Sequence, residues 1–131
     1  MRKIFGWLLA AVVVISCNNE KKDSNDTKTG DPAIDALTEK LTASPNNAAL
    51  YFERAKLLYD KNAYEFAIQD MASAMRLDSN NLQFHHLLAD IYMDDNQSRL
   101  AMRTMERAAN LYPDSIRTLL KLSEFQLILQ F

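Results

Sequence analysis

The sequence has few of the residues that interrupt helices or cross-link chains. Its 131 residues include two glycines, three prolines and one cysteine. A single cysteine excludes an internal disulfide, so a disulfide framework cannot stabilise this fold. Two glycines cannot build the glycine-rich loop that cradles phosphate groups in nucleotide-binding proteins. Scarce glycine and proline, together with a hydrophobic content of 48%, favour an all-α fold.

A strong excess of one charge is also missing, and this limits the class of partner. The chain has 15 basic and 17 acidic residues, a formal charge of −2. If Arg2 and Lys3 are removed with an export signal, the basic residues fall to 13 and the charge becomes −4. Nucleic-acid-binding proteins need a basic face, so the composition argues against a nucleic-acid partner.

The first seventeen residues have the features of an export signal. Arg2 and Lys3 precede an uncharged apolar run at residues 4–15. This run fits a secretory signal and is shorter than the roughly 20 residues that span a bilayer as a helix. It ends with the residues VISC at positions 14–17. This ending resembles the lipobox of bacterial lipoproteins, in which an aliphatic, a variable and a small residue precede an invariable cysteine.

The resemblance implies that residues 1–16 are a lipoprotein signal peptide and that Cys17 becomes the lipidated N-terminus. Palmitate-type acyl chains would hold the protein to a membrane, because each buried CH₂ contributes about 0.8 kcal/mol. Two alternatives stay open: an ordinary signal peptide with a chance cysteine, and an uncleaved anchor. Residues 18–30 contain no apolar residue, so we expect residues 17–30 to form a flexible tether.

The residue after the cysteine bears on the location in the cell envelope. Asn18 is not the aspartate that retains lipoproteins in the inner membrane of the best-known system. We therefore expect attachment to the outer membrane in preference to the inner membrane. A second alternative is that the charged residues 20–23 act as a signal for export to the cell surface.

The folded part of the chain repeats itself with a period of 34 residues. Residues 51–77 align with residues 85–111 and share seven identities. The identical pairs are Ala55/Ala89, Asp60/Asp94, Asn62/Asn96, Ala67/Ala101, Met71/Met105, Ala74/Ala108 and Leu77/Leu111. A fixed period in this range is typical of repeat architectures. It predicts a stack of helical hairpins.

Apolar spacing and turn residues give the expected helices. They cover residues 33–43, 48–61, 64–77, 82–95, 98–111 and 116–131. Asp31 and Pro32 are an N-cap and a first helical residue, and asparagine at 62 and 96 suits a left-handed turn. Small residues such as Ala55, Ala67 and Ala74 let paired helices approach closely, while larger apolar residues fill the space around them.

This pattern resembles the tetratricopeptide repeat (TPR), whose hairpin has 34 residues. The matching positions are the bulky Tyr51, His85 and Leu119, the small Ala55, Ala89 and Ser123, and the closing Pro45 and Pro113. Ser79 replaces the closing proline once, and asparagine replaces the common turn glycine. The resemblance implies an all-α, TPR-type helical-hairpin solenoid with a right-handed superhelix. Its parts would be a capping helix at 31–45, repeats at 46–79 and 80–113, and an incomplete third repeat at 114–131.

The last predicted helix is apolar on several sides. Leu119, Leu120, Leu122, Phe125, Leu127, Ile128 and Leu129 all lie within it. Terminal helices of solenoids usually carry a polar outer face. An open apolar face implies a missing remainder, a partner or self-association. We expect the sequence to belong to a longer repeat array.

The TPR resemblance also implies where a partner would bind, because first helices line the concave surface of such solenoids. The expected groove residues are Phe52, Lys56, Tyr59, Gln83, His86, Asp90, Met93, Arg117, Leu120 and Glu124. This indicates an adaptor that binds a peptide or partner helix in the cell envelope. The alternative is a structural accessory subunit that assembles through its ends or convex face. Arg117 and Lys121 match only part of the basic carboxylate clamp of chaperone-binding members.

No pattern indicates catalysis, a metal or a cofactor. Adjacent His85 and His86 point about 100° apart on a helix and cannot easily share one ion. Asp94 and Asp95 close a helix, and no serine–histidine–acid set stands in a recognisable context. We expect a protein that is not an enzyme and that holds no cofactor.

Overall fold

The computed structural model describes residues 30–130, and the predicted signal peptide and Cys17 lie outside this range. Its regular structure is entirely helical. The helices are α1 (Pro32–Ala43), α2 (Ala48–Asp60), α3 (Tyr64–Leu77), α4 (Leu82–Asp94), α5 (Ser98–Leu111) and α6 (Ile116–Leu129). The predicted helices are present, and their ends differ from the expected ones by no more than two residues.

Side chains and backbone turns fix the helix ends. The Asp31 carboxylate accepts hydrogen bonds from the backbone N–H groups of Ala33 and Ile34, which caps α1. Asn47 and Asn81 cap α2 and α4 in the same way, one repeat apart. Such caps satisfy N–H groups that have no partner inside the helix.

The turn between paired helices uses asparagine, as predicted. Asn62 follows α2 with φ 59°, and Asn96 follows α4 with φ 58°. This left-handed conformation disfavours most side chains, and asparagine tolerates it better than other non-glycine residues. The two turns let α3 and α5 fold back on α2 and α4.

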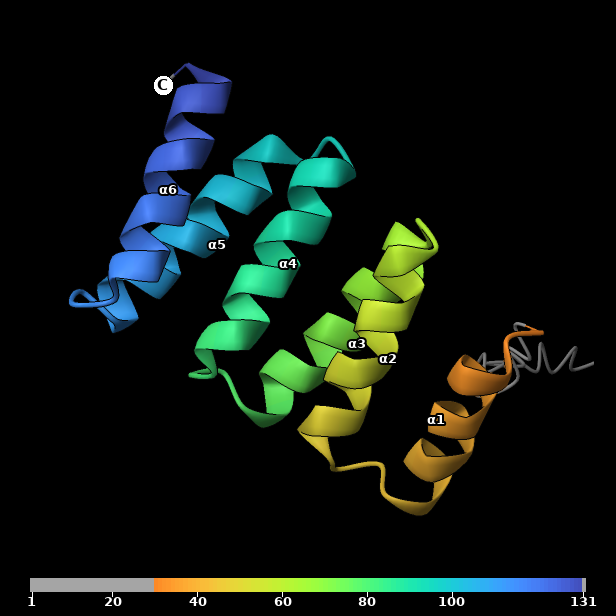
Figure 1. The fold of residues 1–131 in the computed structure, drawn as a ribbon. Helices are drawn as coiled ribbons and strands as arrows, with labels where there is room; N and C mark the ends of the chain where they lie inside the picture. Colours follow the sequence, from red (N-terminus) through yellow and green to blue (C-terminus); the bar gives the residue numbers. More distant parts are fainter. Residues whose placement is uncertain (1–29, 131) are drawn as a thin grey trace, which may run out of the picture.

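The helices stack in chain order from α1 to α6 (Figure 1). α2 and α3 form one antiparallel hairpin, and α4 and α5 form the next. α1 packs on α2, and α6 packs on α5. Apart from small contacts between α2 and α4 and between α4 and α6, the packing joins helices that follow one another in sequence. This is a helical-hairpin solenoid of the TPR type.

The repeated small residues are fully buried where paired helices meet. Ala55, Ala67 and Ala74 of the first hairpin are 0% exposed. Their counterparts Ala89, Ala101 and Ala108 are 0% exposed as well, and so are Met71 and Met105. The sequence identities therefore mark the core, where close packing leaves no room for larger side chains.

Some core residues lie outside the predicted set, and one predicted position differs. Phe84 is 4% exposed and Thr118, 34 positions later, is fully buried, although neither is among the predicted core residues. Leu119, which matches the half-buried Tyr51 and the buried His85, is 42% exposed. No described helix covers that side of α6, so the register alone does not bury this position.

Candidate partner-binding groove

The ten predicted groove residues lie on the first helices of successive repeats. α2 carries Phe52, Lys56 and Tyr59, α4 carries Gln83, His86, Asp90 and Met93, and α6 carries Arg117, Leu120 and Glu124. We call the surface formed by these positions the groove face. Lys56, Gln83, Arg117, Leu120 and Glu124 are exposed, and Phe52, Tyr59, Asp90 and Met93 are half-buried.

An aromatic and cationic cluster lies at the α2 end of the groove face. The rings of Phe52 and Phe84 have centroids 5.0 Å apart and are tilted by 32°. The ammonium group of Lys56 lies 5.5 Å from the centroid of the Phe52 ring and 3.2 Å from a carboxylate oxygen of Glu53. A cation over a ring face is held by the electron density of the ring. This cluster offers a partner an apolar surface beside a positive charge.

Tyr59 joins α2 to α4 across the groove face. Its hydroxyl donates a hydrogen bond of 2.5 Å to the carboxylate of Asp94. Burial raises the pKa of Tyr59 well above its ordinary value, and the nearby Asp94 raises it further. The phenol therefore stays neutral at physiological pH and acts as a hydrogen-bond donor.

Two contacts join α4 to α6. Lys121 forms an ion pair of 2.5 Å with Asp90 and lies 5.7 Å from the centre of the Phe125 ring. The Nε2 atom of His86 lies 3.0 Å from the hydroxyl oxygen of Thr118. The prediction that His86 is an open groove residue is wrong: its side chain is 8% exposed, because it packs toward Thr118. Asp90 is half-buried, and its carboxylate is already paired with Lys121.

These cross-repeat contacts were not predicted from the sequence, although a signal for them exists. Tyr59 and Asp94 are 35 positions apart, and His86 and Thr118 are 32 positions apart. Since successive first helices lie side by side, polar residues separated by about one repeat are neighbours. A search for complementary side chains at that separation would have found these contacts.

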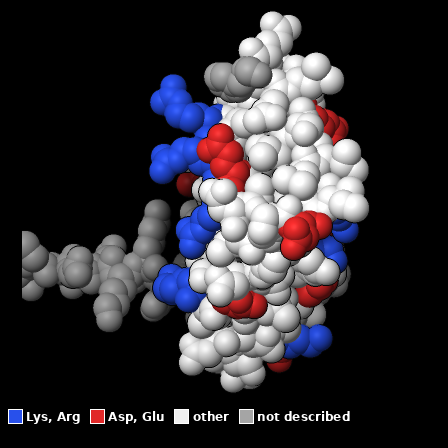
Figure 2. Space-filling view, turned by 90° about the vertical axis from the view of Figure 1, so that its left-hand side faces the viewer, with Lys and Arg blue, Asp and Glu red and all other residues white. Residues whose placement is uncertain are grey.

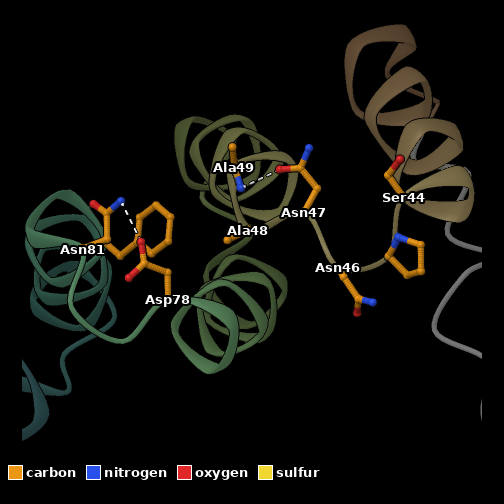
Figure 3. Close-up of a pocket in the computed structure, with 9 residues that line it drawn as sticks. Ser44, Asn46, Asn47, Ala48, Ala49, Asp78 and Asn81 are labelled. Carbon is orange, nitrogen blue, oxygen red and sulfur yellow. Dashed lines mark hydrogen bonds between the residues drawn. The ribbon is translucent and has the colours of Figure 1, made fainter.

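A hollow of about 680 Å³ lies beside the groove face, at the loops that precede α2 and α4. Its lining residues are Ser44, Pro45, Asn46, Asn47, Ala48, Ala49, Asp78, Asn81 and Phe84. Figure 3 shows Asn46 and Asp78 on opposite sides of this hollow, with the start of α2 between them. Phe84 contributes both to the hollow and to the ring contact with Phe52, so the hollow continues the aromatic cluster.

The outer side of α6 is the second candidate surface. Ile116, Leu120 and Leu127 are 73%, 66% and 80% exposed, and Leu119 and Ile128 are also exposed. Figure 2 faces this side of the molecule, and uncharged surface fills most of its centre. The apolar character predicted for this helix is therefore present on the described surface.

Two further observations concern residues 30–130 alone. Within this range no group of three or more histidine, cysteine, aspartate or glutamate side chains is arranged to hold a metal ion. None of the helices α1 to α6 is long and apolar enough to cross a membrane.

Comparison with solved structures shows the fold. MamA superimposes with a TM-score of 0.68 at 22% identity, over 82% of this chain and 66% of that chain. The first TPR domain of Spaghetti (RPAP3), bound to the HSP90 peptide SRMEEVD, gives 0.68 at 21% identity, over 76% and 79%. YrrB, a TPR protein with an unusual peptide-binding site, gives 0.65 at 22% identity, over 74% and 50%. The chain therefore has the tetratricopeptide-repeat fold.

Sequence comparison adds one curated relative. A DnaJ homolog subfamily C member 7 homolog of Dictyostelium discoideum is 31% identical over 107 residues, which is 76% of this chain. The chain spans about a fifth of the length of that relative, 20%. No model of a known protein family matches the chain.

Proposed function

We propose that this chain is a TPR adaptor that binds an extended peptide or a helix of a protein partner on its groove face. The observation that carries the proposal is the cluster of Phe52, Phe84 and Lys56: the buried Phe84 ring supports the half-buried Phe52 ring, beside the exposed Lys56 cation on α2. Aromatic side chains with a charged neighbour are frequent anchors in protein interfaces. Two proteins of the same fold support the proposal: the first TPR domain of RPAP3 is bound to an HSP90 peptide, and YrrB has an unusual peptide-binding site.

The chemistry of the groove face defines the partner only coarsely. Lys56 and Arg117 are exposed cations, Glu124 is an exposed anion, and Leu120 is an exposed apolar side chain. Such a surface fits a partner segment that combines apolar side chains with charges of both signs. The partner's apolar residue would pack on Phe52, and its carboxylate would pair with Lys56.

Site-specific photo-crosslinking in the native protein tests the groove face. We expect a crosslinker at position 52 to capture the same partner peptide repeatedly, and a crosslinker at the exposed Arg103 on α5 to capture none of it. The affinity for the captured partner should then fall about tenfold in Phe52→Ala, the loss typical of an interface anchor. Equal affinities for Phe52→Ala, Lys56→Glu and the control Arg103→Glu would exclude the groove face as the binding site.

We also propose that the mature protein is lipidated at Cys17 and attached to the bacterial cell envelope, at the outer membrane. The support is the sequence alone: the basic start, the apolar run at 4–15 and the VISC ending. Metabolic labelling with a fatty acid should mark the wild-type protein and should fail to mark Cys17→Ser. Fractionation of inner and outer membranes then locates the labelled form. Unlabelled wild-type protein would show that Cys17 is not a lipidation site.

A second candidate function is structural assembly through α6, favoured by its exposed apolar face. Exposed clusters of this kind are typical of interaction sites, since burying them releases ordered water. Sedimentation of the wild-type chain should show concentration-dependent association. The double variant Leu120→Lys with Leu127→Lys should remain monomeric, whereas Arg103→Glu should associate normally. A monomeric wild-type chain at all concentrations would leave the groove face as the candidate surface.

A further inference from the structure

The two histidines of the sequence are adjacent on α4, and each contacts a different neighbour. The Nε2 atom of His85 lies 2.9 Å from the backbone carbonyl oxygen of Ser79, in the loop between α3 and α4. The Nε2 atom of His86 lies 3.0 Å from the Thr118 hydroxyl on α6. The chain contains two histidines in all, so any imidazole titration belongs to this pair.

His85 fits its surroundings only as a neutral imidazole. A carbonyl oxygen can only accept, so Nε2 must carry the proton and donate it to Ser79. The Nδ1 atom is buried and has no hydrogen-bond partner among the described residues. A second proton on Nδ1 would therefore be a buried donor without an acceptor, which is costly. Burial lowers the pKa of His85 below its ordinary value, and the charge of Arg107 on α5 lowers it further, against the opposing bond to Ser79.

The environment of His86 also disfavours its charged form, through burial and the cations of α6. The Thr118 hydroxyl donates a hydrogen bond of 2.8 Å to the Ser115 hydroxyl, so its oxygen accepts the proton of His86 Nε2. Burial lowers the pKa of His86, and the cations Lys121 and Arg117 on α6 lower it further. Asp90 opposes this change from α4, but its carboxylate is paired with Lys121.

We propose that His85 and His86 make the packing of α4 acid-sensitive, so that protonation loosens α4 from the Ser79 loop and from α6. The two side chains contact the structure on both sides of α4, and a second proton on either imidazole places a charge in a buried site. A charged His85 would have a buried N–H without an acceptor, near Arg107. A charged His86 would face Lys121 and Arg117. Because His86 and Thr118 span α4 and α6, acid would alter the spacing of the first helices at that end of the groove face.

The direction of the pH effect follows from the two lowered pKa values. At pH values below 6.5, the ordinary pKa of histidine, the unfolded chain binds more protons on its histidines than the folded chain does. The contribution of the two histidines to stability is therefore constant above about pH 7.5 and falls as the pH drops through 6.5. Between pH 7.5 and 5.5 a histidine that stays neutral in the folded chain throughout reduces the folding equilibrium constant about tenfold, so about a hundredfold is the upper bound for the pair.

Nuclear magnetic resonance of the wild-type chain provides the direct test. Two imidazole Hε1 signals are expected, and both should titrate with midpoints below 6.5. As the pH is lowered to 5.5, the protection factors of the backbone amides, which correct for the intrinsic pH dependence of exchange, should fall in α4 and α6 before they fall in α2 and α3. Midpoints at or above 6.5, or protection factors that fall equally in all helices, would overturn the proposal.

Urea unfolding of matched variants provides the second test. The double variant His85→Leu with His86→Gln keeps every carboxylate, places at 85 the residue found at the equivalent position 119, and keeps a donor for Thr118. It should lose most of the change in the folding equilibrium constant that the wild type shows between pH 7.5 and 5.5. An equal loss of stability in the wild type and the double variant would assign the effect to carboxylates and refute the proposal. If the double variant does not fold, the wild-type titration and exchange data decide the question alone.

Discussion

The guanidinium group of Arg54 on α2 donates two hydrogen bonds of 2.7 Å to the two carboxylate oxygens of Asp70 on α3. Its third nitrogen donates a hydrogen bond of 2.9 Å to the Thr38 hydroxyl on α1. The Arg54 and Asp70 side chains are 13% and 7% exposed. One side chain therefore ties together the first three helices at a site that is largely closed to water.

Breaking this pair should destabilise the fold strongly. Asp70→Asn leaves the Arg54 charge poorly compensated in a nearly buried site, so the free energy of unfolding should fall by about 3 kcal/mol. Urea unfolding at pH 7.5 measures the loss. The double variant Arg54→Leu with Asp70→Thr installs the residues found at the equivalent positions 88 and 104, and should recover much of the stability. A double variant as unstable as Asp70→Asn would contradict this reasoning.

The buried alanines should not tolerate larger side chains. Ala74 of α3 is 0% exposed within the core formed by α1 to α4, so Ala74→Leu should reduce the free energy of unfolding by about 1–3 kcal/mol through overpacking. Ala72 lies two residues earlier on the same helix and is exposed, so Ala72→Leu should leave stability almost unchanged. Thermal unfolding of both variants checks the contrast. Equal effects at the two positions would argue against close packing at Ala74.

The left-handed turn at Asn62 should prefer glycine over alanine. With φ at 59°, a Cβ atom is strained, and alanine lacks the side-chain amide that helps asparagine here. We expect Asn62→Ala to reduce stability by about 1 kcal/mol and Asn62→Gly to preserve it. Asn46→Ala, in an exposed loop without positive φ, is the control for losing an asparagine. Chemical unfolding ranks the three variants.

Tyr59 should resist ionisation at alkaline pH. Burial raises the pKa of Tyr59, and its hydrogen bond to Asp94 adds to the effect. Since the folded state favours the neutral phenol, this contribution to stability is present below about pH 10 and is lost as the pH rises further. Ultraviolet titration of the five tyrosines should show a late component that moves to lower pH in Asp94→Asn. Simultaneous ionisation of all five near pH 10 would be inconsistent with this contact.

The fold could be predicted from the sequence because the chain repeats itself. Equivalent residues of the two hairpins are buried in the same way, as are Ala55 and Ala89 or Met71 and Met105. Identity at a fixed spacing therefore identifies core residues. The alanine-sized gap between paired helices leaves little freedom at these positions. The asparagine turns were found for a similar reason, since a left-handed conformation restricts which residues fit.

The contacts that distinguish the repeats could not be predicted in this way. Arg54 and Asp70 have Leu88 and Thr104 as their equivalents, so no internal comparison shows an ion pair there. His86 occupies the position of the half-buried Phe52, and only the presence of Thr118 on α6 explains why it is buried. Long polar side chains have several possible partners, and the sequence does not state which of them is within reach.

The stacking of helices in chain order also determines how the protein folds. Because almost all packing joins consecutive helices, no contact requires distant parts of the chain to meet first. The entropy of closing loops therefore stays small, and chains of this kind fold in microseconds to milliseconds. Each hairpin can form as soon as its two helices are available and then serve as a template for the next. During synthesis, when the N-terminal residues become available first, each helix can therefore pack on the helix that precedes it without waiting for the rest of the chain.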